Sequence, residues 1–446
     1  MIIPAQRLLL AFSLTVLPAS LAPLFTGYGM ELFAGALLLL SMIAAVDAVA
    51  SLAVLKGIAI DFPARLNMAR RREAFLHVRL SHGKGCPLSL ALGLEIPPAL
   101  SSPWTTVPVV LPEKGGDMSV SWPLTGLERG VHLIRRCRVR TTSPLGLWLA
   151  QSGLDAGVGV HVYPPLHEER KKLAALFTRR NDMLLRPQRQ IGRGREFEKL
   201  RNYLPGDSLG DIHWKATARR GHPVTKEFRI ERTQEVYCVI DASRLSARRD
   251  ADRGGVAGDS FLDACISASL LLAGIAIRQG DLFGVMTFSD QPISFIRAAG
   301  GMGHFGVCRE ALYQTQPSLV TPDFAETASF LASRLRRRAL LLFLTSLDEP
   351  VLADAFSRSI QVLAGRHLAL VHSVSPAAAH PLFSDSGTDD ADDLYDRLGG
   401  HLVWHGLRRT VETLRLRGVE MALTDRERFC ASLAARYLNV KRRQIL

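Results

Sequence analysis

Two long apolar stretches near the start of the chain constrain its fold more than any other feature. They run over Leu8–Phe25 and Leu32–Leu55. A helix rises about 1.5 Å per residue, so roughly 20 apolar residues are enough to cross a hydrocarbon core of about 30 Å. Residues 1–60 are therefore predicted to form a transmembrane helical hairpin.

The charges around these stretches predict how the hairpin is oriented. The turn Thr26–Glu31 carries no Lys or Arg, whereas Arg7 precedes the first stretch and a basic cluster follows the second. Positive charge favours the cytosolic side, so both ends of the hairpin are expected there. This predicts a multi-pass protein of the bacterial inner membrane with most of the chain in the cytosol. A cleaved signal peptide is the alternative interpretation of the first stretch, and the second would still anchor the chain.

Asp47 lies inside the second apolar stretch, where a carboxylate is costly. Neither stretch contains a basic residue that could pair with it. We therefore favour a protonated or hydrogen-bonded helix contact for Asp47, with a proton relay as the alternative.

Net charge and cysteine usage narrow the class of protein. Lys and Arg number 55 against 42 Asp and Glu, a formal net charge of +13, which suits anionic phospholipid, an acidic protein or nucleic acid. The six cysteines are far apart, with no CxxC pair and no zinc-ligand spacing. They are expected to be reduced thiols of a cytosolic body.

The sequence pattern of residues 61–165 predicts a β-sandwich-like domain. Phe75–Leu80 and Val131–Arg140 alternate in a manner typical of half-buried strands, and Gly and Pro interrupt such runs. No cluster of catalytic residue types stands out, so a structural or spacer role is expected.

Residues 166–233 form a basic connector that is richer in aromatic anchors than a flexible linker requires. Acidic residues lie among its many Lys and Arg residues and weaken the local positive field. Binding of nucleic acid phosphates is therefore disfavoured, and a mixed-charge protein-contact surface is a better interpretation than either nucleic-acid binding or a solvated face. The connector is expected to fold onto a neighbouring part of the protein.

Residues 234–446 alternate between apolar strands and amphipathic helices. The first strand, Val236–Ile240, ends at Asp241. Such alternation predicts an α/β domain with a parallel, doubly wound sheet, whose ligands bind at the carboxyl ends of the strands. Further strands are predicted at Leu282–Phe288, Ala339–Leu344, Leu368–Val374 and Val419–Leu423.

Five segments of the connector and the first strand end carry a family signature. They are Gly194–Glu198, Tyr203–Asp207, Ile212–Arg219, Lys226–Phe228 and Asp241–Ser243. Together these segments resemble the domain-of-unknown-function family fifty-eight. The resemblance implies a von Willebrand factor A-like domain, and a partnership with AAA+ ATPases of the MoxR type, whose genes commonly lie beside those of the family. One departure is Gly210, where the family usually has Arg, which puts any partner contact of that Arg in doubt.

The metal-ion-dependent adhesion site of A domains is written Asp-x-Ser-x-Ser, with a Thr and an Asp from later loops, and its oxygen ligands suit Mg²⁺. Asp241 and Ser243 match this pattern, but Leu245 replaces the second Ser. A weak Mg²⁺ site is one interpretation, and a strand-end Asp that caps the next segment is the other. The predicted ligands are Asp241, Ser243, Ser246 and Asp348.

Motifs for catalysis are missing from the sequence. It contains no Walker A and no HExxH motif, and Gly206–Gly210, which has the spacing G-x-S-x-G, lies in the polar connector and not after an apolar strand. We therefore predict a membrane-anchored binding module that adapts a MoxR-type ATPase to envelope or protein-complex maturation. A membrane-bound hydrolase with an unrecognised active site is the alternative.

The connector is predicted to carry the partner-binding residues. Trp214 with flanking arginines has the make-up of an interface hot spot, and a packed core position is the alternative for this side chain. The predicted partner-binding residues are Tyr203, Asp207, Trp214, Arg219 and Arg220.

Overall fold

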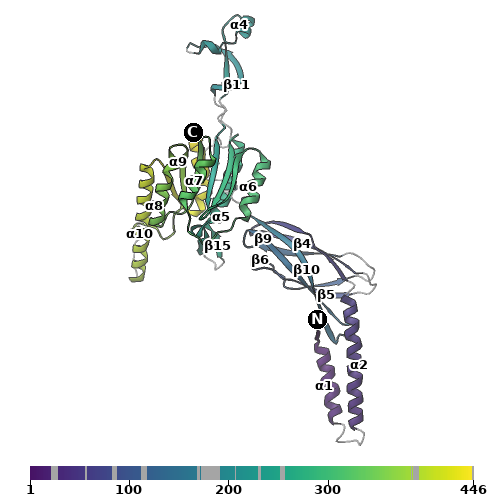
Figure 1. The fold of residues 1–446 in the computed structure, drawn as a ribbon. Coiled ribbons are helices and arrows are strands. Elements are labelled where there is room, and N and C mark those ends of the chain that lie inside the picture. Colours follow the sequence, from purple (N-terminus) through teal and green to yellow (C-terminus); the bar gives the residue numbers. More distant parts are fainter. Residues whose placement is uncertain are drawn as a thin grey trace. The chain divides into compact units, whose positions relative to one another are not determined.

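The computed structural model describes residues 1–21, 29–55, 58–82, 88–111, 118–167, 171, 191–205, 207–229, 233–251, 257–382, 384 and 391–443. The chain divides into two compact units, Met1–Pro164 and Pro165–Leu446. Figure 1 shows the helices and strands of both.

The N-terminal unit begins with two helices that pack against each other, α1 (Gln6–Leu21) and α2 (Gly29–Leu55) (Figure 1). Within α2, Ala34–Ser51 is long and apolar enough to cross a membrane. The apolar part of α1 is shorter, Gln6–Val16. Phe25, the predicted end of the first span, lies outside the described residues.

A third apolar helix, α5 (Phe261–Arg278), also has the length and hydropathy of a membrane span. However, 72% of it is buried inside the C-terminal unit, where it belongs to a core cluster with strand residues. The apolar side chains of α5 therefore pack in the core of the C-terminal unit.

Two sheets pack around one core in the rest of the N-terminal unit. The first has the order β1 (Ile2–Pro4), β10 (Trp148–Tyr163), β9 (Gly130–Thr142), β5 (Leu88–Leu94) and β7 (Val107–Leu111), with β3 (Arg65–Ala69) also on β10. The second has the order β2 (Ile58–Asp61), β4 (Glu73–His82), β8 (Met118–Gly126) and β6 (Leu100–Ser101). The alternating runs of the sequence fall in β4 and β9 because one side chain in two faces the core.

Asp47 lies within the second apolar stretch and is buried against the β-domain. Its carboxylate is 2% exposed and accepts hydrogen bonds from the loop that joins β9 to β10. The prediction of a hydrogen-bonded contact is right in kind, but the donors belong to a β-hairpin loop and not to a helix. This partner was not predictable because it lies almost 100 residues away in the sequence.

The connector folds into a small element of its own, which we call the β11–β12 module (residues 191–229). Strand β11 (Ile191–Asn202) pairs antiparallel with β12 (Val224–Arg229). Between them lie the short helices η3 (Leu209–Asp211) and α4 (Trp214–Arg220). The many polar residues of this stretch are therefore compatible with a folded structure.

A mixed α/β domain makes up the remainder of the C-terminal unit. Its main sheet has the order β17 (Pro292–Ala299), β16 (Leu282–Phe288), β13 (Glu235–Asp241), β18 (Ala339–Leu344), β19 (Leu368–Val374) and β20 (Glu420–Thr424). These strands are parallel except β17, an antiparallel edge strand that the sequence pattern did not predict.

Helices cover both faces of this sheet (Figure 1). One core cluster contains residues of α5, α6 (Met302–Gln314) and α11 (Phe429–Arg443), and the other contains residues of α7 (Phe324–Arg334), α8 (Pro350–Ser359), α9 (Gln361–Ala364) and α10 (Ala391–Leu416). Because neighbouring parallel strands end at the same edge, the segments after β13, β18 and β19 gather there. That edge carries the predicted strand-end residues.

Candidate functional site

Asp241 is the last residue of β13 and is fully buried. Its Oδ1 accepts a hydrogen bond from the backbone N–H of Ser243 at 2.8 Å, and its Oδ2 accepts one from Thr345 Oγ1 at 2.6 Å. Asp241 therefore joins the segment after β13 to the segment after β18.

The two neighbouring serines also bond within the protein. Ser243 caps the short helix η4 (Arg244–Ala247) by accepting from the backbone N–H of Leu245 at 3.3 Å. The hydroxyl of Ser246 donates to the carbonyl of Ser243 at 2.8 Å. This is the geometry expected of a strand-end aspartate and serine that stabilise the following turn.

Asp348, the fourth predicted ligand, is held by other partners. It pairs with Arg248 and accepts a hydrogen bond from Ser346 Oγ at 2.8 Å. Beside it, Arg244 forms a bidentate pair with Glu349, with both N–O distances at 2.7 Å. Two Arg–carboxylate pairs therefore connect the η4 segment to the segment after β18.

These donors fit a Mg²⁺ ion poorly. Mg²⁺ prefers near-octahedral oxygen ligands with free lone pairs. Both oxygens of Asp241 already accept bonds from protein donors, and Arg248 brings a positive charge to Asp348. Among the residues that the structure describes, no group of three or more Asp, Glu, His or Cys is placed to hold a metal ion. The Mg²⁺ site stays a prediction, and the capping interpretation agrees better with this geometry.

Burial raises the pKa of Asp241 above its ordinary value of 3.8, while the hydrogen bonds from Ser243 and Thr345 act in the opposite direction. The folded protein therefore holds this proton longer than the unfolded chain does. As the pH rises above about 4, the unfolded state ionises first, so the contribution of Asp241 to stability falls with rising pH.

Asp241→Asn should consequently be at least as stable as the parent at neutral pH, with a difference that grows between about pH 4 and pH 7. The amide oxygen can still accept from Ser243, and the amide N–H can donate to Thr345 Oγ1. Urea unfolding of the detergent-solubilised chain with and without Mg²⁺ is the measurement. A large loss of stability, or a Mg²⁺-dependent stabilisation of the parent that the variant lacks, would favour the metal site.

A second group of predicted residues lies in the β11–β12 module. Asp207 forms a bidentate pair with Arg201, with N–O distances of 2.7 and 2.8 Å, and accepts from the backbone N–H of Leu204 at 2.9 Å. The bonds from Arg201 and Leu204 lower the pKa of Asp207. Tyr203 is half-buried, and its backbone N–H donates to Pro223. Asp207 and the Tyr203 backbone thus stabilise the module, which is a different role from the predicted direct contact.

Helix α4 presents the remaining predicted residues. His213 Nδ1 caps its start by accepting from Ala216 N at 3.0 Å, and Gly221 ends it with φ of +71°. Trp214 is 69% exposed, so the alternative of a packed core position is wrong. At about 100° per residue, Arg219 and Arg220 lie roughly 140° and 120° from Trp214 around the helix axis, in opposite directions.

Exposed apolar side chains near α4 were missed at the level of sequence. Leu204 and Leu209 are both exposed in the segments that precede the helix. Arg244, Arg248 and Glu349 were also missed. The only sign of their pairing in the sequence was the opposite charge of the segments that follow β13 and β18. The paired residues are about 100 positions apart, so the sequence did not show which of them meet.

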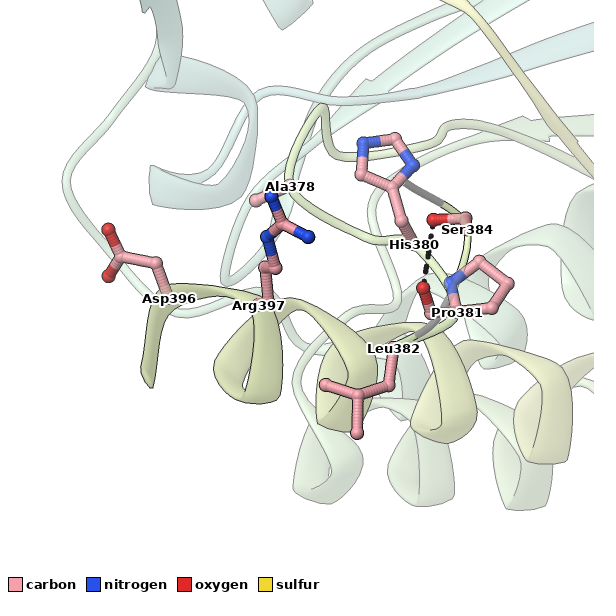
Figure 2. A pocket seen from close by; sticks show the side chains of 7 residues that line it. All are labelled: Ala378, His380, Pro381, Leu382, Ser384, Asp396 and Arg397. Carbon is pink, nitrogen blue, oxygen red and sulfur yellow. Dashed lines mark hydrogen bonds between the residues drawn. The ribbon is translucent and has the colours of Figure 1, made fainter. Parts of the chain in front are cut away.

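A small cavity of about 180 Å³ lies beside the segment that follows β19 (Figure 2). His380 and Ser384 come from that segment, and Arg397 comes from the first part of α10. The Ser384 hydroxyl donates to the Pro381 carbonyl at 2.8 Å, so it is not oriented by His380 as a nucleophile would be. The cavity is lined by Ala378, His380, Pro381, Leu382, Ser384, Asp396 and Arg397.

The structure therefore combines an apolar helical hairpin and a β-domain with a mixed α/β domain. Residues 199–381 match the family described as "Protein of unknown function DUF58". This match confirms the resemblance found in the sequence. The matched region contains the strand-end residues and helix α4.

Two curated relatives are similar in sequence. The uncharacterized protein YeaD of Bacillus subtilis is 25% identical over 155 residues, which cover 30% of this chain and 33% of that protein. The uncharacterized protein Rv1480 of Mycobacterium tuberculosis is 25% identical over 185 residues, 41% of this chain and 56% of that protein. The match thus spans a third to about half of these relatives.

Two solved structures show a weaker likeness. BatB from Bacteroides thetaiotaomicron is 12% identical with a TM-score of 0.30, covering 46% of this chain and 98% of that one. An aerotolerance-related membrane protein from Bacteroides fragilis is 13% identical with a TM-score of 0.27, over 46% and 98% of the two chains. TM-scores this low do not establish a shared fold.

Proposed function

We propose that this protein is a membrane-anchored protein-binding module that acts as an adaptor for a AAA+ ATPase of the MoxR type. In this proposal the α/β domain is a doubly wound, von Willebrand factor A-like domain used for binding and not for catalysis. The ATPase supplies the energy, and the adaptor brings it to a client in envelope or protein-complex maturation.

The exposure of Trp214 is the observation that carries the proposal. A tryptophan buries a large apolar area when it packs, yet 69% of this side chain faces solvent on a folded element. Lys215, Arg219 and Arg220 are also exposed on α4. An aromatic anchor with neighbouring cations is typical of an interface hot spot, and the cations favour an acidic partner surface.

The β11–β12 module holds this surface ready for a partner. The Arg201–Asp207 pair closes the turn before η3, and Thr217 Oγ1 accepts from Val224 N at 3.1 Å, which ties α4 to β12. A surface that is ordered before binding loses less conformational entropy in the complex. This supports a binding role for the module.

The strand-end residues support binding over catalysis. The Arg244–Glu349 and Arg248–Asp348 pairs lie at the edge where ligands of such sheets bind. In each pair the charge of the arginine is balanced by that of the carboxylate. The hydrolase alternative requires an oriented nucleophile and base, and the Ser384 hydroxyl in the cavity of Figure 2 does not provide one.

The anchor in this proposal is the helical hairpin in the bacterial inner membrane, with the bulk of the chain in the cytosol. The apolar length of α2 and the basic residues that follow it support this placement. The phospholipid bilayer is thus a second partner, and nucleic acid is not one.

Trp214→Ala should weaken binding of the ATPase by about 2 kcal/mol or more, roughly thirtyfold in Kd. Arg219→Ala and Arg220→Ala should weaken it as well, since both cations are exposed on the same short helix as Trp214. Surface plasmon resonance between the detergent-solubilised chain and the purified MoxR-type ATPase of the same cell measures these effects.

Tyr395→Ala is the matched control, because Tyr395 is 71% exposed on α10. This variant should bind as the parent does, and thermal unfolding should be unchanged in every variant. If the Trp214 and Arg219 variants bind the ATPase as tightly as the parent, the proposed surface is wrong.

A further inference from the structure

Asp47 joins the hairpin to the β-domain through one loop, Ser143–Leu147, which we call the β9–β10 loop. Its carboxylate accepts bonds from Ser143 Oγ at 2.5 Å, Leu145 N at 3.0 Å and Leu147 N at 3.3 Å. Three donors from one loop converge on a single buried carboxylate. The loop is therefore fixed beside one turn of α2.

Further contacts place the start of α1 beside the same loop and the same turn of α2. The indole N–H of Trp148 donates to Ala44 O at 2.8 Å, and the backbone N–H of Ala5 donates to Leu147 O at 2.9 Å. Gly146 has φ of +74°, and a Cβ at this position would approach Arg7 Nη1 to 2.9 Å. Both helices thus leave the β-domain beside the β9–β10 loop.

The length of α2 beyond this loop is close to the thickness of a bilayer. Glu31 in the first turn and Asp47 are 16 residues apart, about 24 Å along the helix axis. No charged residue lies between them, and the hydroxyl of Ser41 donates to Leu37 O within the helix. A hydrocarbon core of about 30 Å would therefore reach the level of Asp47.

Beyond Asp47 the helix packs on protein. The contacts of α2 with β9 and β10 and the burial of Ser51 show that its last turns lie against the β-domain. These turns are apolar in sequence, and one side of them is covered by protein while Val49 is 69% exposed. The embedded part is thus shorter than the predicted span Leu32–Leu55.

We propose that the β9–β10 loop docks on the cytosolic face of an anionic bilayer, with Leu145 inserted at the boundary between headgroups and acyl chains. This inference rests on the proposed membrane anchoring and adds a surface of the β-domain to it. Leu145 is 56% exposed at the loop, while its backbone N–H is held by Asp47. Arg7 and Trp148 suit the same level, since Arg binds lipid phosphate and Trp favours the interface.

Depth-dependent quenching tests this placement. The full chain is reconstituted in vesicles of phosphatidylethanolamine and phosphatidylglycerol after labelling Leu145→Cys, Leu38→Cys or Val131→Cys with an environment-sensitive fluorophore. The parent chain, treated identically, gives the background from its own thiols. Leu38 is exposed on α2, and Val131 is exposed on β9 about 36 Å along the strand from Thr142.

The label at Leu145 should lose fluorescence mainly with a quencher at the lipid headgroup, and the label at Leu38 mainly with a quencher deep in the acyl chains. The label at Val131 should lose none. Quenching at Leu38 without quenching at Leu145 would overturn the loop docking and leave the anchor intact. No quenching at Leu38 would overturn both proposals, and equal quenching at Val131 and Leu145 would show general adhesion of the β-domain.

Discussion

Replacing Asp47 by alanine should destabilise the N-terminal unit by about 3 kcal/mol, because buried donors that lose their shared acceptor are costly. The substitution leaves the hydroxyl of Ser143 and the backbone N–H groups of Leu145 and Leu147 without their shared partner. Asp47→Asn keeps one acceptor oxygen and should have a smaller effect. The hairpin and the β-domain should separate more readily in both variants.

Hydrogen exchange of the peptide that contains the β9–β10 loop measures this directly, because the Leu145 and Leu147 amides lose their acceptor. Unfolding in urea, followed on the detergent-solubilised chain, gives the change in free energy. Glu31→Ala removes an exposed carboxylate from the same helix and is the control. Unchanged exchange in Asp47→Ala would show that Asp47 does not hold the loop.

Asp281→Ala should destabilise the α/β domain by about 3 kcal/mol or more, since it removes one half of a buried ion pair and leaves other donors unsatisfied. Asp281 is 1% exposed. It accepts bonds from Lys441 Nζ at 2.8 Å, from the Tyr437 hydroxyl and from Gln234 N at 3.2 Å. It therefore connects the last helix, α11, to the start of β13.

Chemical unfolding followed by circular dichroism measures this effect, with Asp354→Ala as the control on the exposed side of α8. Tyr437→Phe should lose about 1 kcal/mol, the usual contribution of one hydrogen bond. Burial and the Asp281 carboxylate raise the pKa of Tyr437, so its hydroxyl stays a donor at neutral pH. An Asp281→Ala chain as stable as the control would contradict the role of this cluster.

Local patterns in the sequence predicted many elements of the fold closely. The strands Leu282–Phe288, Ala339–Leu344 and Leu368–Val374 have the bounds that their apolar runs indicated. Strands buried on both faces are apolar throughout, so their ends are visible as a change to polar residues. Strand β17 was missed because it lies at an edge and is only partly buried.

Candidate site residues were harder to predict. Asp241 was found because the end of a parallel strand is a local feature with a known consequence. Its bond to Thr345 was not, and neither was the pairing of Asp348 with Arg248, which changes a predicted ligand into one half of an ion pair. Trp214 could be recognised as an anchor, but its exposure depends on which side of α4 faces β12.

The sequence by itself determined where apolar segments, alternating strands and helix boundaries lie, because these depend on residues within one or two turns of each other. Only the tertiary structure decided that Asp47 binds a loop almost 100 residues away and that Asp348 pairs with Arg248. Both depend on which surfaces meet after folding. A carboxylate or an apolar segment looks the same in the sequence whether it lies in lipid, in a protein core or at a contact between elements. The surfaces that surround it after folding decide which of these environments it has.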